Sequence, residues 1–216
     1  MGSNSKLSLL SSDHSQGDML GFDPCILDHD GELRLFPDAF APTESAQLMN
    51  TLCNDVPWTQ HQLKLFGKQL RAPRLSAWFG EPHCRYSYSG ISLEPLPLTP
   101  ILETLRSRVE ALCEVEFNCV LLNLYRDGSD SMSWHSDDEP ELGRDPDIAS
   151  ISFGGERRFL LKHKSERERT LSLTLGNGSL LLMRAPLQRY WLHSVPKTKK
   201  VIAPRLNLTW RFIARS

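Results

Sequence analysis

Residues 134–139, WHSDDE, place His135 and Asp137 two positions apart in an acidic stretch. In a β-strand, residues i and i+2 project from the same face, so this imidazole and this carboxylate could hold one metal ion together. In a chain with 7 His and 26 acidic residues, composition alone supplies roughly one histidine-x-acid triplet. The triplet therefore indicates a metal site only if the chain also contains a third ligand and residues whose chemistry would use the metal.

His193, in the segment YWLHSVP, is the candidate for the third ligand, because it lies at the edge of a β-rich region among bulky neighbours. The other histidines lie in the N-terminal half or among charged residues: His14, His29, His61, His83 and His163. Two histidines and one carboxylate with open coordination positions are typical of non-haem Fe(II) oxygenases. A zinc hydrolase could use the same three donors.

The C-terminal segment RLNLTWR, residues 205–211, favours the oxygenase. Alternation places four polar side chains on one face of this strand, namely Arg205, Asn207, Thr209 and Arg211. Two guanidinium groups on a buried face are costly unless they are paired, and a planar guanidinium suits a carboxylate ligand. Asn123 and Tyr125, on one face of the segment CVLLNLY, could add neutral donors. The alternative is a polar strand face that meets water.

Residues 117–216 have the pattern of a mostly β domain. Short apolar runs alternate with turn signals: FNCVLLNLY, SMSWHSD, IASISFGG, RRFLLKH, RTLSLTL, SLLLMR and APRLNLTWRFI. Several short strands with tight turns predict an antiparallel sandwich or jelly roll rather than βαβ units. We therefore expect residues 117–216 to form a jelly-roll core with helices flanking it.

The N-terminal half is expected to form an extension of this core. Residues 1–20, rich in Ser, Asp and Gly, predict a disordered tail. Within residues 21–116, one helix is expected from Thr43, and a second after the Thr99-Pro100 capping signal. The apolar stripe expected on the second helix is Ile101, Leu105, Val109 and Leu112. Between the helices lie a basic segment, HQLKLFGKQLRAPR, and an aromatic strand, YSYSG.

Overall composition narrows the functional classes. The chain has 216 residues, 40% of them hydrophobic, and 25 basic against 26 acidic residues give a net charge of −1. Binding to nucleic acid would therefore require a local basic face. No apolar run is long enough for a membrane span of about 18 residues. The five cysteines are odd in number and form no CxxC pair, which predicts free thiols and an intracellular location.

These motifs together resemble the AlkB family of Fe(II)/2-oxoglutarate-dependent dioxygenases: NLY (123–125), HSD (135–137), His193 and RLNLTWR (205–211). Four segments are most similar in sequence to animal AlkB homologues that act on double-stranded DNA: YRDGSDSMSWHSDDE, SISFGGERRF, LKHK and APRLNLTWR. The resemblance implies a double-stranded β-helix, with Fe(II) held by His135, Asp137 and His193. It implies that 2-oxoglutarate is bound by Arg205, Asn123 and Tyr125, with Asn207 and Arg211 near the iron and its carboxylate ligand.

The resemblance also implies an activity. O2 and 2-oxoglutarate would be converted to succinate and CO2 while an N-methyl group of 1-methyladenine or 3-methylcytosine in DNA is hydroxylated and lost as formaldehyde. Because the methyl group lies on the Watson–Crick edge, the base must leave the stack. The implied base contacts are Tyr86, Tyr88, Ser89, His135 and Glu139. Residues 60–92 would form a nucleotide-recognition lid with a finger, Leu65, Phe66 and Gly67, and phosphate contacts at Lys64, Lys68, Arg71 and Arg74.

Two alternatives stay open from the sequence. The same chemistry could act on RNA or on a protein side chain, or the chain could be a non-catalytic module that binds nucleic acid. We expect DNA, single- or double-stranded, or RNA as the partner of a monomer that does not contact membranes. The expected location is the cytoplasm in a bacterium and the nucleus in a eukaryote.

Overall fold

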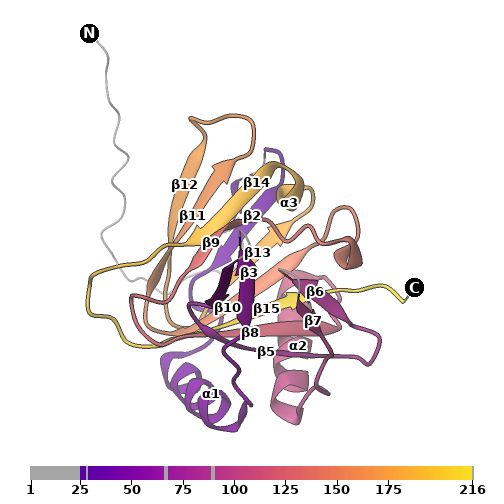
Figure 1. The fold of residues 1–216 in the computed structure, drawn as a ribbon, viewed down its shortest axis with the longest axis vertical. Helices are drawn as coiled ribbons and strands as arrows, with labels where there is room; N and C mark the ends of the chain where they lie inside the picture. The colour runs from indigo at the N-terminus through magenta and orange to yellow at the C-terminus, as the bar shows by residue number, and fades with distance from the viewer. Residues whose placement is uncertain (1–24, 28, 66–67, 89–90, 216) are drawn as a thin grey trace, which may run out of the picture.

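Two antiparallel β-sheets face each other in the core of the protein (Figure 1). The computed structural model describes residues 25–215 apart from 28, 66–67 and 89–90, with backbone only at 63–65, 68–69, 86–88 and 91–93. The larger sheet has the order β1 (Cys25–Leu27), β2 (Glu32–Phe36), β13 (Ser179–Arg184), β10 (Ile148–Gly154), β15 (Arg205–Arg211), β8 (Cys119–Tyr125) and β5 (Leu75–Gly80). The smaller sheet has the order β12 (Thr170–Leu175), β11 (Arg157–His163), β14 (Trp191–Val195) and β9 (Met132–His135). The predicted jelly roll is confirmed.

Strand β15 lies between β10 and β8, and its two faces differ as the sequence predicts. Leu206, Leu208 and Trp210 belong to the apolar cluster that packs against the helices. The alternate residues face the smaller sheet, and Arg205 pairs in register with Tyr125 of β8. Side chains at paired positions of neighbouring strands project from the same face of a sheet. The polar residues of β10, β15 and β8 therefore meet between the two sheets.

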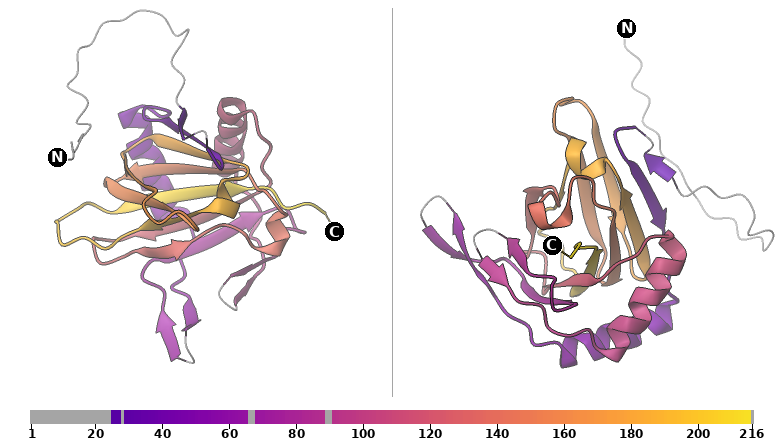
Figure 2. Two further views of the ribbon diagram at one scale, coloured as in Figure 1. Left: turned by 90° about the horizontal axis from the view of Figure 1, so that it is seen from above. Right: turned by 90° about the vertical axis from the view of Figure 1, so that its right-hand side faces the viewer.

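Two helices cover the outer face of the larger sheet, α1 (Pro42–Asp55) and α2 (Pro100–Cys113) (Figure 2). Thr99 caps α2, because its side chain accepts a hydrogen bond from the N–H of Leu102, as the capping signal predicts. The buried stripe of α2 is Leu102, Leu105, Val109 and Cys113. The prediction for Leu112 is wrong, because its side chain is 39% exposed. No helix in the described part of the chain is long and apolar enough to cross a membrane.

The segment predicted as an extension supplies part of the main sheet. Strands β1, β2 and β5 all precede residue 117, and β2 pairs with β13 while β5 pairs with β8. The segment predicted as the lid contains two hairpins, β3 (Gln62–Leu65) with β4 (Lys68–Arg71) and β6 (Tyr86–Tyr88) with β7 (Ile91–Leu93). Both project from the same side of the molecule (Figure 2, right).

Candidate active site

The three predicted metal ligands converge between the sheets. His193 on β14 pairs in register with His135, the last residue of β9, and the centroids of their rings are 4.2 Å apart. Ligand atoms of His135, Asp137 and His193 all lie within 4.8 Å of one another. Two imidazoles and one carboxylate from different parts of the chain can therefore face a single ion.

The orientation of the Asp137 side chain has a different cause from the strand alternation that the spacing suggested. Strand β9 ends at His135, so Asp137 lies beyond the strand and strand alternation does not orient it. Its backbone N–H donates a hydrogen bond to Oε1 of Gln188 at 2.9 Å, and its Oδ2 lies 3.0 Å from Nη2 of Arg211. These two contacts hold the main chain and the carboxylate of Asp137.

Hydrogen bonding also sets the tautomer of His135. Its Nδ1 lies 2.9 Å from the carbonyl oxygen of Ser133. A carbonyl oxygen only accepts hydrogen bonds, so Nδ1 carries the proton and Nε2 keeps its lone pair. Nε2 lies 3.8 Å from Oδ1 of Asp137, a separation that suits two ligands of one ion. The imidazole of His135 is thus oriented as a metal ligand through Nε2.

The charge states of the triad match the needs of a divalent metal. Burial, and next the neighbouring His135, lower the pKa of His193 to about 3, so the ring is neutral at pH 7. Burial raises the pKa of Asp137, but Arg211 and the two histidines lower it by more, to about 2. Nδ1 of His193 is buried and has no hydrogen-bond partner among the described residues. Two neutral imidazoles and a carboxylate fit Fe(II).

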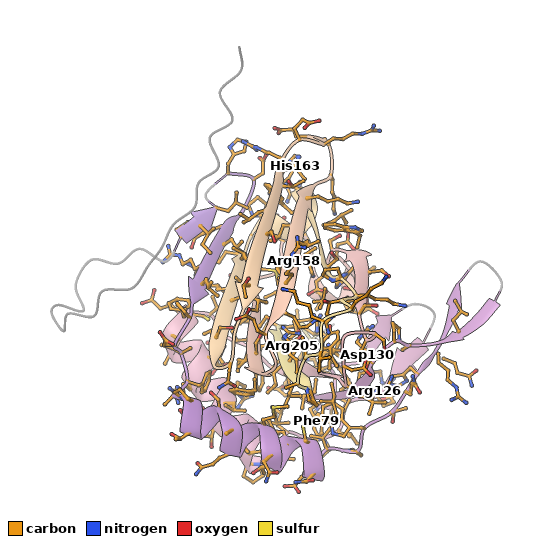
Figure 3. All side chains as sticks on the ribbon, turned by 90° about the vertical axis from the view of Figure 1, so that its left-hand side faces the viewer. Phe79, Arg126, Asp130, Arg158, His163 and Arg205 are labelled. Carbon is orange, nitrogen blue, oxygen red and sulfur yellow. The ribbon has the colours of Figure 1, made fainter. Side chains whose placement is uncertain are left out.

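Arg205 is the second unusual group in this cavity, and Figure 3 shows it in the interior, far from His163 at the end of β11. The residue is 1% exposed, and its Nη2 donates a hydrogen bond to Oγ of Ser152 at 2.9 Å. Nε and Nη1 are buried without a hydrogen-bond partner among the described residues. A buried cation with unused donors is costly, so the arrangement fits an anionic ligand that is bound beside it.

The other predicted co-substrate residues line the same cavity, which has about 430 Å³ of empty space, including its open mouth. Tyr125 is almost fully buried, and its ring lies 5.2 Å from the guanidinium carbon of Arg205. The amide of Asn207 donates to Oγ of Ser150 and to the carbonyl oxygen of Ile151, both at 2.8 Å. Both amide hydrogens of Asn207 are therefore engaged by the protein, which makes it a structural member of the wall.

Arg74 does not lie on the exposed surface that a phosphate contact requires. It is 5% exposed, and its Nε donates a hydrogen bond to Oδ1 of Asn123 at 2.8 Å. Its Nη1 lies 3.5 Å from the carbonyl oxygen of Ser131. Arg74 thus holds the side chain of Asn123 against the cavity, although the basic segment around it suggested contact with DNA.

Replacing Arg74 with methionine is expected to raise the KM for 2-oxoglutarate about tenfold or more, with a smaller change in kcat. The change removes a hydrogen bond from a charged donor, worth about 1.5–3 kcal/mol, and so releases Asn123. Initial rates at varied 2-oxoglutarate measure this effect. Arg85→Met is the control, because the side chain of Arg85 is 74% exposed and pairs with Glu94. An unchanged KM in Arg74→Met would contradict this role.

The predicted base and DNA contacts are placed less completely. The backbones of Tyr86 and Tyr88 form β6, while Ser89, Phe66 and Gly67 lie outside the described residues. The backbones of Lys64 and Leu65 lie in β3 and that of Lys68 in β4, where Arg71 is exposed. Glu139 precedes the 3₁₀ turn Pro140–Leu142 and is half-buried, outside the residues found to line the cavity. These base and phosphate contacts stay predictions.

Sequence reasoning missed several residues of the site. The apolar wall of the cavity comes from Leu121, Met132, Phe159, Met183 and Val195. Ser150 and Ser152 could have been found, because they alternate with Ile151 and Phe153 along β10 as the polar face of that strand. Gln188 carried no comparable signal, since a single glutamine between two strands has no periodic pattern.

Comparison with known proteins agrees with this geometry. The family model described as the 2OG-Fe(II) oxygenase superfamily matches residues 32–211. The human protein named alpha-ketoglutarate-dependent dioxygenase alkB homolog 3 is 41% identical over 188 residues, covering 83% of this chain and 65% of that protein. The human DNA oxidative demethylase ALKBH2 is 40% identical over 184 residues, covering 81% and 70%. ALKBH2 of Arabidopsis thaliana is 35% identical over 216 residues, covering 87% and 68%.

A solved structure shares the fold. The structure of OsALKBH1 superposes with a TM-score of 0.62 at 14% sequence identity, covering 88% of this chain and all of that chain. The chain spans about two thirds of the length of the curated relatives named above. Members of the matched superfamily use Fe(II) and 2-oxoglutarate, which agrees with the triad and with Arg205. The chain belongs to the 2OG-Fe(II) oxygenase superfamily and, within it, to the AlkB homologues.

Proposed function

We propose that this chain is an oxidative demethylase that removes N-linked methyl groups from 1-methyladenine and 3-methylcytosine in DNA. The observation that carries the proposal is the meeting of two features in one cavity. His135, Asp137 and His193 can hold one ion. In the same cavity, Nε and Nη1 of the buried Arg205 have no hydrogen-bond partner among the described residues and can bind an anion. A hydrolase would use the triad but would leave this arginine without a ligand.

Each residue has a distinct part in the proposed reaction. His135, Asp137 and His193 would hold Fe(II), which together with 2-oxoglutarate and O2 supplies the oxidising equivalents for hydroxylation of a methyl group. Arg205 would bind the carboxylate of 2-oxoglutarate that lies farther from the metal. Arg211, 3.0 Å from Asp137, keeps that ligand ionised. The hydroxylated methyl group then leaves the base as formaldehyde, with succinate and CO2 as the other products.

The substrate base must reach this cavity from outside the duplex. The side chain of His135 is 20% exposed, so its ring is accessible at the rim of the cavity. We propose that a flipped base stacks on this ring, with Tyr88 of β6 on the opposite side and Tyr86, Ser89 and Glu139 nearby. The position of β6–β7 in a hairpin that projects from the core supports its use as a lid.

DNA is the proposed substrate class because of the relatives and the basic hairpin. Two of the relatives are named DNA oxidative demethylase. Residues 64–71 of the β3–β4 hairpin contain Lys64, Lys68 and Arg71 and no acid, which suits contact with phosphates. A near-zero net charge predicts modest binding that weakens with salt.

A comparison of substrates tests this assignment. Single-stranded DNA, double-stranded DNA and RNA that carry the same 1-methyladenine or 3-methylcytosine are incubated with protein, Fe(II) and 2-oxoglutarate. Methyl loss is followed by mass spectrometry. We expect methyl loss from DNA. Turnover with the RNA alone would replace DNA by RNA as the substrate, and succinate formation without methyl loss from any strand would contradict a nucleic-acid substrate.

Replacement of Phe66 with alanine is expected to reduce repair of duplex DNA about tenfold or more while it affects single-stranded DNA much less. The proposed finger fills the gap that a flipped base leaves, and unstacking one step costs about a few kcal/mol. Leu70→Ala is the matched control, because Leu70 lies on the same hairpin and is 50% exposed. An equal loss on both substrates would contradict a finger at Phe66.

An intracellular location is proposed as well. Cys53, Cys84, Cys113 and Cys119 are free thiols in the structure, and the last three of these are buried. Free thiols persist in reducing compartments, where iron in the Fe(II) state is also maintained. Fractionation of the native cell, followed by detection of the protein, tests this location.

A further inference from the structure

Gln188 is a buried polar residue that contacts one of the three metal ligands. It is 2% exposed and lies on the four-residue helix α3 (Leu187–Tyr190), which directly precedes the strand that carries His193. Its Oε1 accepts the hydrogen bond from the backbone N–H of Asp137 at 2.9 Å. One short segment of chain therefore carries one metal ligand and holds the main chain of a second.

Helix α3 is itself anchored to the loop that contains Asp137. Lys164, which follows β11, donates from Nζ to the main-chain oxygen of Gln188 at 2.8 Å. The same Nζ lies 3.3 Å from Oδ2 of Asp138, and Oγ of Ser136 donates to that oxygen at 2.8 Å. Both neighbours of Asp137 are thus held by side-chain hydrogen bonds. The loop and α3 are joined at two points, Gln188 and Lys164.

The bond from Asp137 to Gln188 bears on the metal because the amide is buried. A buried N–H that loses its acceptor is costly, so the loop would rotate to find another partner. Rotation of the loop moves the Asp137 carboxylate relative to the two imidazoles. Gln188 is not among the residues found to line the cavity, so it acts through Asp137 and not on the metal or the substrate.

We propose that Gln188 is a positioning residue whose side-chain oxygen fixes Asp137 and so determines how tightly the triad binds metal. The inference rests on the proposed function, because it assumes that the triad holds a metal ion. Partners that orient metal ligands typically contribute about 10–100-fold to metal affinity or activity. The affinity for metal is therefore the quantity that a change at Gln188 should alter.

Titration of the metal-free protein with Co(II), without nucleic acid or 2-oxoglutarate, tests this role through the visible absorption of the bound ion. Gln188→Met removes the acceptor at similar size, and we expect its Kd for Co(II) to rise about tenfold or more. Gln188→Glu keeps an acceptor oxygen, and we expect its Kd to stay well below that of Gln188→Met. Circular dichroism verifies that both variants are folded.

A folded Gln188→Met protein with the wild-type Kd would overturn the proposal. Hydrogen exchange of the Asp137 amide in the metal-free wild type provides a test that needs no variant. We expect this amide to be protected, and exchange at the rate of a free amide would overturn the proposal even if Gln188→Met does not fold. Absence of Co(II) binding by the wild type would instead overturn the proposed function, on which the inference rests.

Discussion

Replacing His135 with alanine is expected to lower demethylation by about three orders of magnitude or more, because it removes one of three metal ligands. A bound metal ion contributes several kcal/mol to a transition state, and each 1.36 kcal/mol corresponds to a tenfold change in rate. The fold should tolerate the change, since the side chain is 20% exposed and its hydrogen bond to Ser133 is local. The rate of methyl loss measures the effect on demethylation, and titration with Co(II) measures the effect on metal binding.

His29→Ala provides the control for this variant. The side chain of His29 is 59% exposed and pairs with Asp30. With Asp30 and Glu166 it forms a second, exposed group of possible ligands away from the residues that line the cavity, so the control also tests whether Co(II) binds there. The control should bind Co(II) and turn over as the wild type does. A folded His135→Ala protein that keeps wild-type turnover would show that His135 is not a ligand, and the assignment of the triad would be wrong.

Arg205→Met is expected to abolish stabilisation by 2-oxoglutarate. A ligand at 100 times its Kd stabilises a protein by about 2.7 kcal/mol, and 1 kcal/mol corresponds to about 2–4 °C in Tm for a chain of this size. In the presence of Co(II), 2-oxoglutarate should therefore raise the wild-type Tm by roughly 5–10 °C. In Arg205→Met the shift should disappear, because the guanidinium that would pair with the carboxylate is gone and Arg211 in the same cavity is already paired with Asp137. Thermal melts with and without 2-oxoglutarate measure it.

The ligand-free Tm separates this role from a structural one. Methionine removes the hydrogen bond from Nη2 of Arg205 to Ser152, but it also removes a buried cation whose Nε and Nη1 have no hydrogen-bond partner among the described residues, so the ligand-free Tm should change little. Arg205→Lys retains the charge but loses the planar donor group, and should restore part of the shift. A full shift in Arg205→Met would contradict carboxylate binding by Arg205.

The sequence predicts the fold class well and the details of the helices less well. Alternation along residues 205–211 correctly separates the cavity face from the apolar face, because a strand has a strict period of two. In the stripe of α2, Leu105 and Val109 are buried as predicted, but both ends are displaced by one residue, with Leu102 and Cys113 buried and Leu112 exposed. Helical periodicity leaves such neighbours ambiguous until the packing partner is known. Segments before residue 117 join the main sheet through pairings that no local pattern reveals.

The site shows the same limit. The three metal ligands and Arg205 were predicted, and the structure brings them into one cavity. The reasons for their placement depend on contacts distant in the sequence. Asp137 is held by Gln188 across 51 positions, and Arg74 reaches Asn123 across 49. The pattern of a basic segment does not reveal which of its side chains is buried. Arg74 was therefore predicted to contact a DNA phosphate.

The most direct test of the account is the mass of a DNA oligonucleotide that carries 1-methyladenine. The oligonucleotide is incubated with the purified protein, Fe(II), 2-oxoglutarate and O2, and succinate is measured in parallel. The account predicts loss of the methyl group, dependent on both Fe(II) and 2-oxoglutarate, with at least one succinate formed for each methyl group removed. An unchanged methylated strand, in the presence of folded protein that binds metal and 2-oxoglutarate, would contradict it.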